Sequence, residues 1–380
     1  MIVGDRLGDN AQVETLVDAL DFPVERKYVR VVDPWVKGKP RVRPSLHHID
    51  RSVSDALEPP WPDLVITVGR RLSMVALWIR EQSAGRTRLV LVGKPSGAHD
   101  PFSLIVTSSE VQIAPADNVL RIGLPLLRVD EAKVAEAAEA WRDRLADLPR
   151  PLIGLLVGGP TNPFVFNRQV RDGLLQTARE VVTRDGGTPY VTTSPRTPPK
   201  VVDALRAGLP PEARFFEWRR GAPDNPYHAL LGLADGFVVT GDSISMLVEV
   251  AKLGKPLGIF PLPYGPLHKL DRVRREGAHW LYEPDSGDGK DGLRRAIRKT
   301  GGALGILPRT RDFSALHRLL VDRGLAVTAG EPLRPPSGSV PDDLPAVAAR
   351  IRALLDDDPA SGAQVPPDQA HGPANGGNER

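Results

Sequence analysis

Short apolar runs alternate with helix-length segments along most of the chain. Two short apolar runs, Leu64–Val68 and Arg88–Val92, are bounded by residues typical of turns. Runs of this kind are typical of strands buried on both faces of a parallel sheet. Further strands are expected at 102–106 and 119–123, and the segment 130–148 predicts a long helix with Asp130 as its N-cap. The first part of the chain is therefore expected to form a parallel α/β sheet.

The second part of the chain alternates more regularly. Helical patterns separate the predicted strands, and the first helix is expected to stop at Gly186 and Gly187. Strict alternation of strands and helices of this length implies a parallel sheet with right-handed crossovers. The expected fold class is α/β, with two doubly wound, Rossmann-like domains facing a cleft. The predicted strands of the second part are 152–157, 189–193, 214–217, 236–240 and 257–261.

Proline-rich punctuation at 148–151 places the expected domain boundary. The N-terminal domain then covers 1–148, and the C-terminal domain covers 149–330. Residues 331–358 are expected to form a linker and an amphipathic helix that carries Leu344, Val347 and Ile351 on one face. Residues 359–380 have too few apolar groups to offset their ordering entropy, and a disordered tail is expected there.

Composition narrows the class of protein. The 380 residues contain no cysteine, which removes disulfides, cysteine-based zinc sites and thiol nucleophiles. Fifty lysines and arginines against 47 acidic residues give a net charge of +3, far from the basic excess of a nucleic-acid binder. No apolar run reaches the roughly 18 to 20 residues of a membrane span. We expect a soluble, cytoplasmic protein without a protein-built metal site, because the eight histidines are scattered.

Ligands of open parallel sheets bind beyond the carboxyl ends of the strands, so the strand-to-helix loops are the places to search. The first candidate loop follows strand 152–157. Its paired glycines let the backbone approach a ligand closely, and the N–H groups of such a loop can bind phosphate. A tight turn with no ligand explains the glycines equally well. The residues of this loop are Gly158, Gly159, Pro160, Thr161 and Asn162.

The second candidate loop enters a helix at 243. It is dense in small polar groups, and Glu249, nearly two turns into the helix, is positioned to accept from a ribose diol. The alternative is a capped helix with Asp242 or Ser243 as N-cap and Glu249 on the surface. The density of polar groups favours binding. The ligand-facing candidates of this loop are Gly241, Asp242, Ser243, Ser245 and Met246.

The third candidate loop runs from Gly4 to Gln12. Asp9 with Gln12 forms a capping-box pattern, which is the favoured interpretation. Asp9, or alternatively Asp5, facing the cleft would instead act as a general base. Weaker candidates at the ends of other strands and at a turn are Ser194, Arg196, Trp218 and Asn225.

The order of these motifs resembles the bacterial relatives of the plant mitochondrial-fission family of the elongated-mitochondria type. Members of that family are also catalogued as glycosyltransferases or as nucleoside-diphosphate-sugar epimerases. The resemblance covers residues 1–330, and the combined order is more specific than any single motif. The motifs that carry it are Gly4 to Gln12, Gly69 to Arg71, Gly158 to Thr161, Thr192 to Ser194, Asp224 to Tyr227, Val238 to Met246 and Gly254 to Pro256.

The second half of the chain also resembles the donor domain of GT-B glycosyltransferases. The resemblance implies that Gly158, Gly159 and Thr161 face a diphosphate together with Ser243 and Ser245. It further implies that Glu249 binds the ribose. The base of those enzymes is a histidine in the N-terminal loop, and here Asp9 would have to take that role.

The leading expectation is a GT-B glycosyltransferase that moves a sugar from a nucleoside-diphosphate sugar to an unknown acceptor by metal-independent displacement. It needs no cofactor; a lipid-linked molecule and a glycan both stay open as the acceptor, and so does a peripheral contact with the inner membrane. Two alternatives keep the fold: a nucleoside-diphosphate-sugar epimerase, and a non-catalytic adaptor that recruits other proteins.

Overall fold

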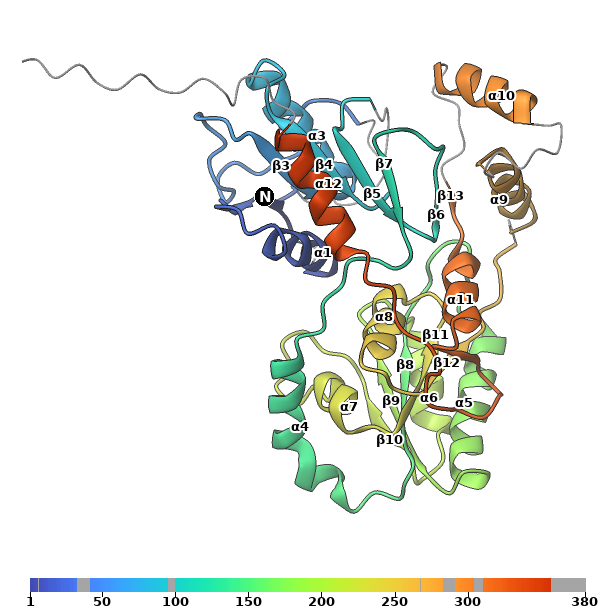
Figure 1. The fold of residues 1–380 in the computed structure, drawn as a ribbon. Helices are drawn as coiled ribbons and strands as arrows, with labels where there is room; N and C mark the ends of the chain where they lie inside the picture. Colours follow the sequence, from blue (N-terminus) through green and yellow to red (C-terminus); the bar gives the residue numbers. More distant parts are fainter. Residues whose placement is uncertain are drawn as a thin grey trace, which may run out of the picture.

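The computed structural model describes residues 1–5, 7–32, 42–94, 100–266, 268–282, 291–303 and 310–356. The chain forms two α/β domains, one above the other in Figure 1, and each is built on a parallel sheet. The expected fold class of two Rossmann-like domains is confirmed. The tail expected at 359–380 lies outside the described residues.

The first domain is built on the parallel sheet β3-β4-β5-β7, and the parallel pair β1–β2 packs beside β3. The apolar runs of β3 and β4 have buried faces, as their sequence predicts. The strand expected at 102–106 begins two residues later. The elements are β1 Ile2–Val3, α1 Leu7–Asp18, β2 Lys27–Tyr28, β3 Leu64–Val68, α3 Gly69–Gln82, β4 Arg88–Val92, β5 Leu104–Ser108, β6 Val111–Gln112 and β7 Val119–Ile122.

The second domain holds a sheet of strand order β10-β9-β8-β11-β12-β14, in which all neighbours are parallel. The chain winds outward from β8 through β9 to β10 and then returns to β11 on the other side of β8. The order therefore reverses between β8 and β11. The strands are β8 Leu152–Val157, β9 Thr188–Thr193, β10 Arg214–Phe216, β11 Gly236–Thr240, β12 Leu257–Phe260 and β14 Val327–Thr328.

Helices cover both faces of this sheet. Their apolar stripes are the ones that the sequence predicts, for example Val170, Leu174, Ala178 and Val181 on α5. The helices around this sheet are α5 Arg168–Thr183, α6 Pro199–Gly208, α7 Tyr227–Leu233, α8 Ile244–Lys252 and α11 Phe313–Asp322. Two further helices, α9 His268–Tyr282 and α10 Asp291–Ala303, lie away from it.

The helix α4 (Glu131–Ala146) belongs to the second domain, although the sequence pattern places it at the end of the first. Asp130 caps it as predicted, by accepting a hydrogen bond from the backbone N–H of Lys133 at 3.0 Å. Its buried Val134 and Leu145 join the apolar core of the second domain, and α4 packs against α7. The prolines near 150 thus mark the end of a helix, and the change of domain falls ahead of α4.

The last described helix, α12 (Leu344–Asp356), returns to the first domain. Its Val347, Ala348 and Ile351 are buried in the apolar core of that domain (Figure 1). The two crossings between the domains are braced, because the N–H of Gly123 donates to Asp343 Oδ2 at 2.7 Å. Lys252 Nζ also donates to the carbonyl of Leu127 at 2.5 Å. The chain therefore passes from the first domain to the second ahead of α4 and returns to the first ahead of α12.

A short antiparallel pair also bridges the domains. The strand β6 of the first domain pairs with β13 (Thr310–Arg311), which directly precedes α11 of the second. The helix α9 packs against both strands, and α10 packs on α9 (Figure 1). No helix of the described part of the chain is both long and apolar enough to cross a membrane.

The packing of α12 predicts the effect of truncating its buried face. Ile351→Ala should lower the free energy of unfolding by about 2–5 kcal/mol, because it leaves a cavity in the core of the first domain. The exposed Ala349→Ser on the same helix is the control, with an expected change of about 0.5 kcal/mol or less. Urea denaturation of the full chain, with hydrogen exchange followed in β3 and β4, measures both. Equal stability of the two variants would contradict the docking of α12.

Candidate functional site

The loops that follow β8 and β11 meet where the strand order reverses, the position at which open α/β sheets bind ligands. Two backbone N–H groups of the first loop donate to side chains of the second. The N–H of Gly158 donates to Thr240 Oγ1 at 2.8 Å, and that of Gly159 donates to Asp242 Oδ2 at 2.9 Å. Thr240 in turn donates to Asp242 Oδ1 at 2.8 Å. The sequence prediction that these loops come together is thus supported by direct contacts.

Asp242 is the centre of this network. Its side chain is 0% exposed, and Arg196 of the loop after β9 forms an ion pair with it, with 3.1 Å between Nη2 and Oδ2. Ser243 Oγ donates to the same oxygen at 3.3 Å. Burial raises the pKa of the Asp242 carboxyl, whereas the Gly159 N–H, the Thr240 hydroxyl and the Arg196 charge oppose that rise. A buried carboxylate is expensive without such partners. Three loops are therefore tied to one carboxylate.

The loop after β9 is fixed to the glycine loop by Thr197. Its hydroxyl donates to the carbonyl of Gly158 at 2.6 Å, and it accepts from the N–H of Ser194 at 2.9 Å. Arg196 Nη1 also donates to Thr161 Oγ1 and, at 3.3 Å, to the carbonyl of Gly159. Ser194 is buried, and 49% of the Arg196 side chain is exposed. Arg196 is thus the side chain of this cluster that combines a charge with access to solvent.

The two glycines are required by space. A Cβ on Gly158 would lie 2.2 Å from Ser243 Oγ and 2.3 Å from a carboxylate oxygen of Asp242. A Cβ on Gly159 would lie 2.2 Å from the backbone oxygen of Arg196. Both N–H groups are also engaged with protein acceptors. The glycines serve close packing between loops here, and their two N–H groups are not free to bind phosphate in this conformation.

At the start of α8, Asp242 and Ser243 are buried and Ser245 is exposed to solvent. Ser243 occupies the N-cap position, but its side chain makes no capping hydrogen bond and donates to Asp242 instead. Ser245 in the first turn is exposed, and Met246 is half-buried against the core. The helix N-terminus carries a partial positive charge, which favours an anion at this position. Ser243 is therefore the N-cap residue by position, as the capped-helix interpretation expects, but its side chain does not cap the helix.

A second polar group forms between α7 and α8. Tyr227 Oη donates to Glu249 Oε2 at 2.7 Å, and Asn225 Oδ1 accepts from the N–H of Tyr227 at 3.1 Å. Burial raises the pKa of the Glu249 carboxyl, and the hydrogen bond from Tyr227 opposes the rise. The pKa of Tyr227 lies well above its usual value because the hydroxyl is buried, and the charge of Glu249 and the hydrogen bond to it raise the pKa further. Glu249 is thus already engaged through Oε2, and its Oε1 makes no hydrogen bond with the residues that the structure describes.

The remaining predicted residues of the second domain lie near strand ends. Trp218 follows β10 and is half-buried, and its N–H donates to Thr193 Oγ1 at 2.9 Å. Pro160 and Asn162 are exposed in the glycine loop. The carbonyl of Gly241 accepts from His317 Nε2 at 2.7 Å. Burial lowers the pKa of His317, so its neutral ring holds the second loop from the side of α11.

The predicted base lies partly outside the described structure. Asp9 belongs to α1, but its side chain is not among the described ones, so its role and the capping-box interpretation stay predictions. The alternative, Asp5, is exposed and accepts a hydrogen bond from Tyr28 Oη at 2.5 Å. That bond raises the pKa of Tyr28. Asn10 holds the same loop, since its amide group makes hydrogen bonds of 3.1 and 2.7 Å with the N–H and carbonyl of Gly4.

One carboxylate at the domain junction was not predicted. Glu110 follows β5, at the carboxyl edge of the first sheet, and is only 3% exposed. Its Oε2 has no hydrogen-bond partner among the described residues, while its carbonyl accepts from the N–H of Asp312 at 2.7 Å. A buried acceptor without a partner is rare in folded proteins and needs an explanation. The only sequence signal is that Glu110 directly follows a strand.

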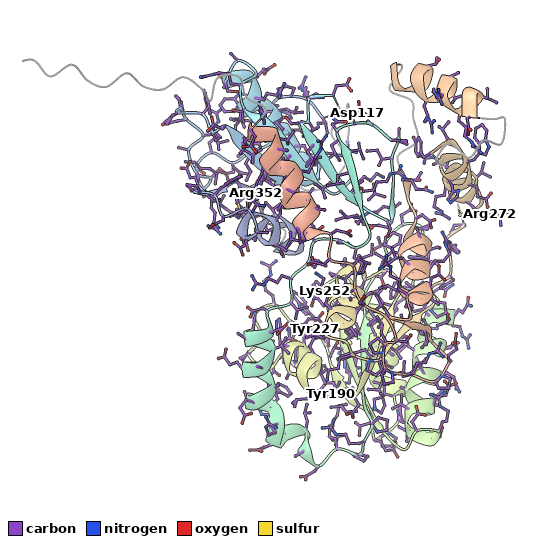
Figure 2. The ribbon with its side chains drawn as sticks, viewed as in Figure 1. Asp117, Tyr190, Tyr227, Lys252, Arg272 and Arg352 are labelled. Atoms are coloured by element: carbon purple, nitrogen blue, oxygen red, sulfur yellow. The ribbon has the colours of Figure 1, made fainter. Side chains whose placement is uncertain are left out.

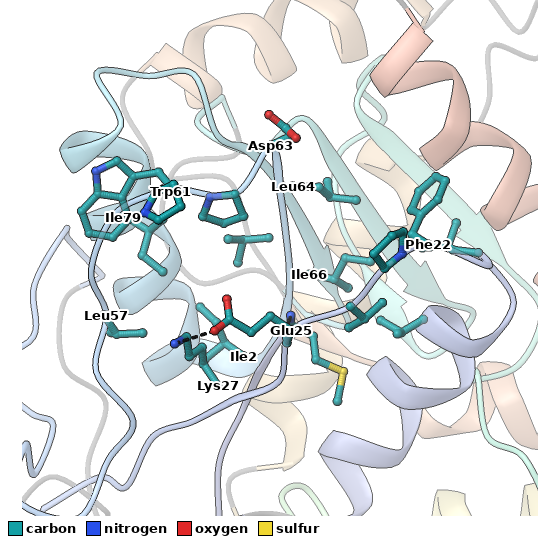
Figure 3. A pocket seen from close by; sticks show the side chains of 18 of the residues that line it. Ile2, Phe22, Glu25, Lys27, Leu57, Trp61, Asp63, Leu64, Ile66 and Ile79 are labelled. Atoms are coloured by element: carbon teal, nitrogen blue, oxygen red, sulfur yellow. Dashed lines mark hydrogen bonds and ion pairs between the residues drawn. The ribbon is translucent and has the colours of Figure 1, made fainter.

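An apolar pocket of about 450 Å³ lies in the first domain (Figure 3). Phe22, Leu57 and Trp61 line it, and Lys27 and Glu25 form an ion pair of 2.7 Å at its edge. It contains the first residues of β1 and β3, so it lies at the amino ends of the strands, opposite the usual ligand edge. No group of three or more His, Asp or Glu side chains among the described residues is arranged to hold a metal ion.

The fold and the switch-point loops define the class: a two-domain α/β protein of GT-B-like architecture, whose candidate site lies at the carboxyl edge of the second sheet. The chain belongs to the mitochondrial fission ELM1 family, whose model matches residues 8–276. The mitochondrial fission protein ELM1 of Arabidopsis thaliana is 28% identical over 286 residues, which cover 64% of this chain and 66% of the plant protein. The uncharacterized protein RP120 of Rickettsia prowazekii (strain Madrid E) is 22% identical over 249 residues, 57% of this chain and 70% of that protein.

The solved structures with a similar fold share less sequence identity with this chain than these two relatives do. A UDP-GlcNAc 2-epimerase from Methanocaldococcus jannaschii has a TM-score of 0.43 and 11% identity, covering 93% of this chain and 98% of that one. A glycosyltransferase from Rickettsia africae ESF-5 has a TM-score of 0.39 and 10% identity, covering 84% and 96%. Likenesses of this degree carry no argument about activity.

The contacts of the glycine loop predict a stability difference between two glycines. Gly159→Ala should lower the free energy of unfolding by about 1–3 kcal/mol, because the new methyl meets the backbone of Arg196. Gly277→Ala in α9 is the control, since its Cβ meets nothing within 4 Å, and a helical Gly→Ala change gains up to about 1 kcal/mol. Urea denaturation compares the two variants. A Gly159→Ala protein as stable as the parent would show that the loop has room that the structure denies.

Proposed function

We propose that the protein is a GT-B-type glycosyltransferase that takes its sugar from a nucleoside-diphosphate sugar in the cytoplasm. The observation that carries this proposal is the network around Asp242, which assembles the loops after β8, β9 and β11 into one polar surface at the switch point. Arg196 and the first turn of α8, where Ser245 is exposed, supply positive charge and a donor there. These groups would offset the charge of a leaving diphosphate without a metal.

The proposed chemistry is a direct displacement. Asp9 accepts the proton of the acceptor hydroxyl while that oxygen attacks the anomeric carbon, and the bond to the diphosphate breaks. A positioned base of this kind contributes about 10²–10⁴-fold to a rate. Glu249 binds the ribose with the carboxylate oxygen that Tyr227 does not occupy. Each role extends the family resemblance to a residue of this chain.

Calorimetric titration with UDP-, GDP- and ADP-sugars, followed by product analysis, tests the proposal. We expect at least one donor to bind, Glu249→Ala to weaken it about tenfold, and Asp9→Asn to spare binding while turnover falls at least a hundredfold. Glu136→Ala, an exposed site on α4, and Asp18→Asn, an exposed site on α1, are the controls.

The contrary results are specific. Binding of no nucleotide by the folded protein would favour the non-catalytic adaptor. Unchanged turnover in Asp9→Asn would remove the base assignment and leave the donor site standing.

Glu110 favours a second candidate function, a nucleoside-diphosphate-sugar epimerase. Such an enzyme needs a further carboxylate to move a proton at the sugar, and Glu110 is a buried carboxylate at the domain junction whose Oε2 has no hydrogen-bond partner within the described part of the chain. Glu110→Gln keeps the shape and removes the basic oxygen. If the protein is an epimerase, sugar interconversion followed by NMR should be lost in this variant while donor binding persists. Transfer to an acceptor without interconversion in the parent protein would decide for the transferase.

A further inference from the structure

A pocket of about 320 Å³ lies between the domains, next to the glycine loop. It contains Gln112 of β6, residues of α9, and the beginning of α11. The glycine loop continues directly into its wall, because the N–H of Val165 donates to the carbonyl of Pro263 at 3.0 Å and that of Gly265 donates to the carbonyl of Pro163 at 2.9 Å. The rings of Phe164 and Tyr264 also pack 5.4 Å apart. The pocket and the switch-point loops thus share the carboxyl edge of one sheet.

Positive charge dominates the lining of this pocket. Three arginines, Arg272, Arg275 and Arg318, face two carboxylates, Glu276 and Asp312. His279 adds a further charge when it is protonated. Figure 2 shows Arg272 on α9, beside the junction of the two domains. A concave site with an excess of guanidinium groups is suited to a phosphate group, which arginine binds in a bidentate manner.

The arginines differ in what holds them. Arg272 pairs with Glu276 and Arg318 with Asp312, each at 3.4 Å, and both arginines are largely exposed. Arg275 makes no ion pair among the described residues, and its guanidinium lies 5.5 Å from the centre of the Tyr264 ring. The carbonyl of Arg275 accepts from Gln112 Nε2 at 3.2 Å, which fixes its backbone to the first domain. Arg275 is therefore a cation with a fixed backbone and, within the described part of the chain, no carboxylate partner.

Hydroxyl donors complete the pocket. Tyr264 Oη and Ser314 Oγ lie 3.2 Å apart on its wall. Ser314 is placed by Asp312, whose Oδ1 accepts from the N–H of Ser314 at 3.1 Å as the cap of α11. Hydroxyls beside arginines are common donors to phosphate oxygens. The pocket thus offers both charge and hydrogen-bond donors.

We propose that this pocket binds the phosphate groups of the ligand, with Arg275 as the central cation and Arg272 and Arg318 at its rim. This assignment rests on the proposed function in so far as the ligand is a nucleoside-diphosphate sugar. It supplies what the glycine loop does not, because the N–H groups of Gly158 and Gly159 are engaged and Arg196 is shared with Asp242. Since Gln112 comes from the first domain, a bound phosphate would contact both domains.

Titration of the full chain with inorganic pyrophosphate tests the site without any nucleotide. We expect Arg275→Ala, and separately the double variant Arg272→Ala with Arg318→Ala, to weaken pyrophosphate binding about tenfold or more. Arg168→Ala is the matched control, since this exposed arginine of α5 also forms an i,i+4 pair at 3.4 Å, with Asp172. It should stay within about twofold of the parent. The double variant changes exposed side chains alone, so it keeps the test valid if Arg275→Ala fails to fold.

The outcomes separate this site from the proposed function. Pyrophosphate binding that the folded pocket variants leave unchanged, or that the parent lacks, overturns the site. If the variants weaken pyrophosphate but no nucleotide sugar binds to the parent, the phosphate site stands and the transferase proposal fails. If nucleotide sugars bind equally to parent and variants, the transferase proposal stands and the diphosphate lies elsewhere.

Discussion

The buried carboxylate of Asp242 is the interaction on which the candidate site depends. It accepts from a backbone N–H of the glycine loop, from a hydroxyl of its own loop and from Arg196 of a third loop. A carboxylate that is withdrawn from water is stable only with such partners, so the three loops must stay together as long as it remains charged. Thr197 reinforces the arrangement through the carbonyl of Gly158. The polar surface at the switch point is therefore preorganised rather than formed by a ligand.

The switch-point loops and the arginine pocket have different roles in this arrangement. The glycine loop packs closely against the other two loops and keeps them in place. The positive charge comes from Arg196, from the start of α8 and from the arginine pocket between the domains. The neutral ring of His317 connects the two surfaces, because it holds the carbonyl of Gly241 and stacks on Phe164. Packing of α11 thus joins the second candidate loop to the wall of the pocket between the domains.

Much of the fold could be predicted from the sequence, because apolar runs and helical stripes are local patterns. The surface on which an amphipathic helix packs is not encoded in its own sequence. The pattern therefore does not show that α4 packs on the second domain or that α12 packs on the first domain. The loops of the site follow from the rule that ligands bind at strand ends. The engagement of the glycine N–H groups by Asp242 depends on residues more than 80 positions apart. Arg275 and Arg318 come together only through tertiary packing, which also buries Glu110.

A crystal structure of the protein with UDP tests the central claim most directly. We expect the diphosphate between the loops around Arg196 and Ser243 and the pocket around Arg275, with the Asp242 network intact. Density for the nucleotide at the amino ends of the first sheet, or a glycine loop released from Asp242 to bind phosphate, would contradict it.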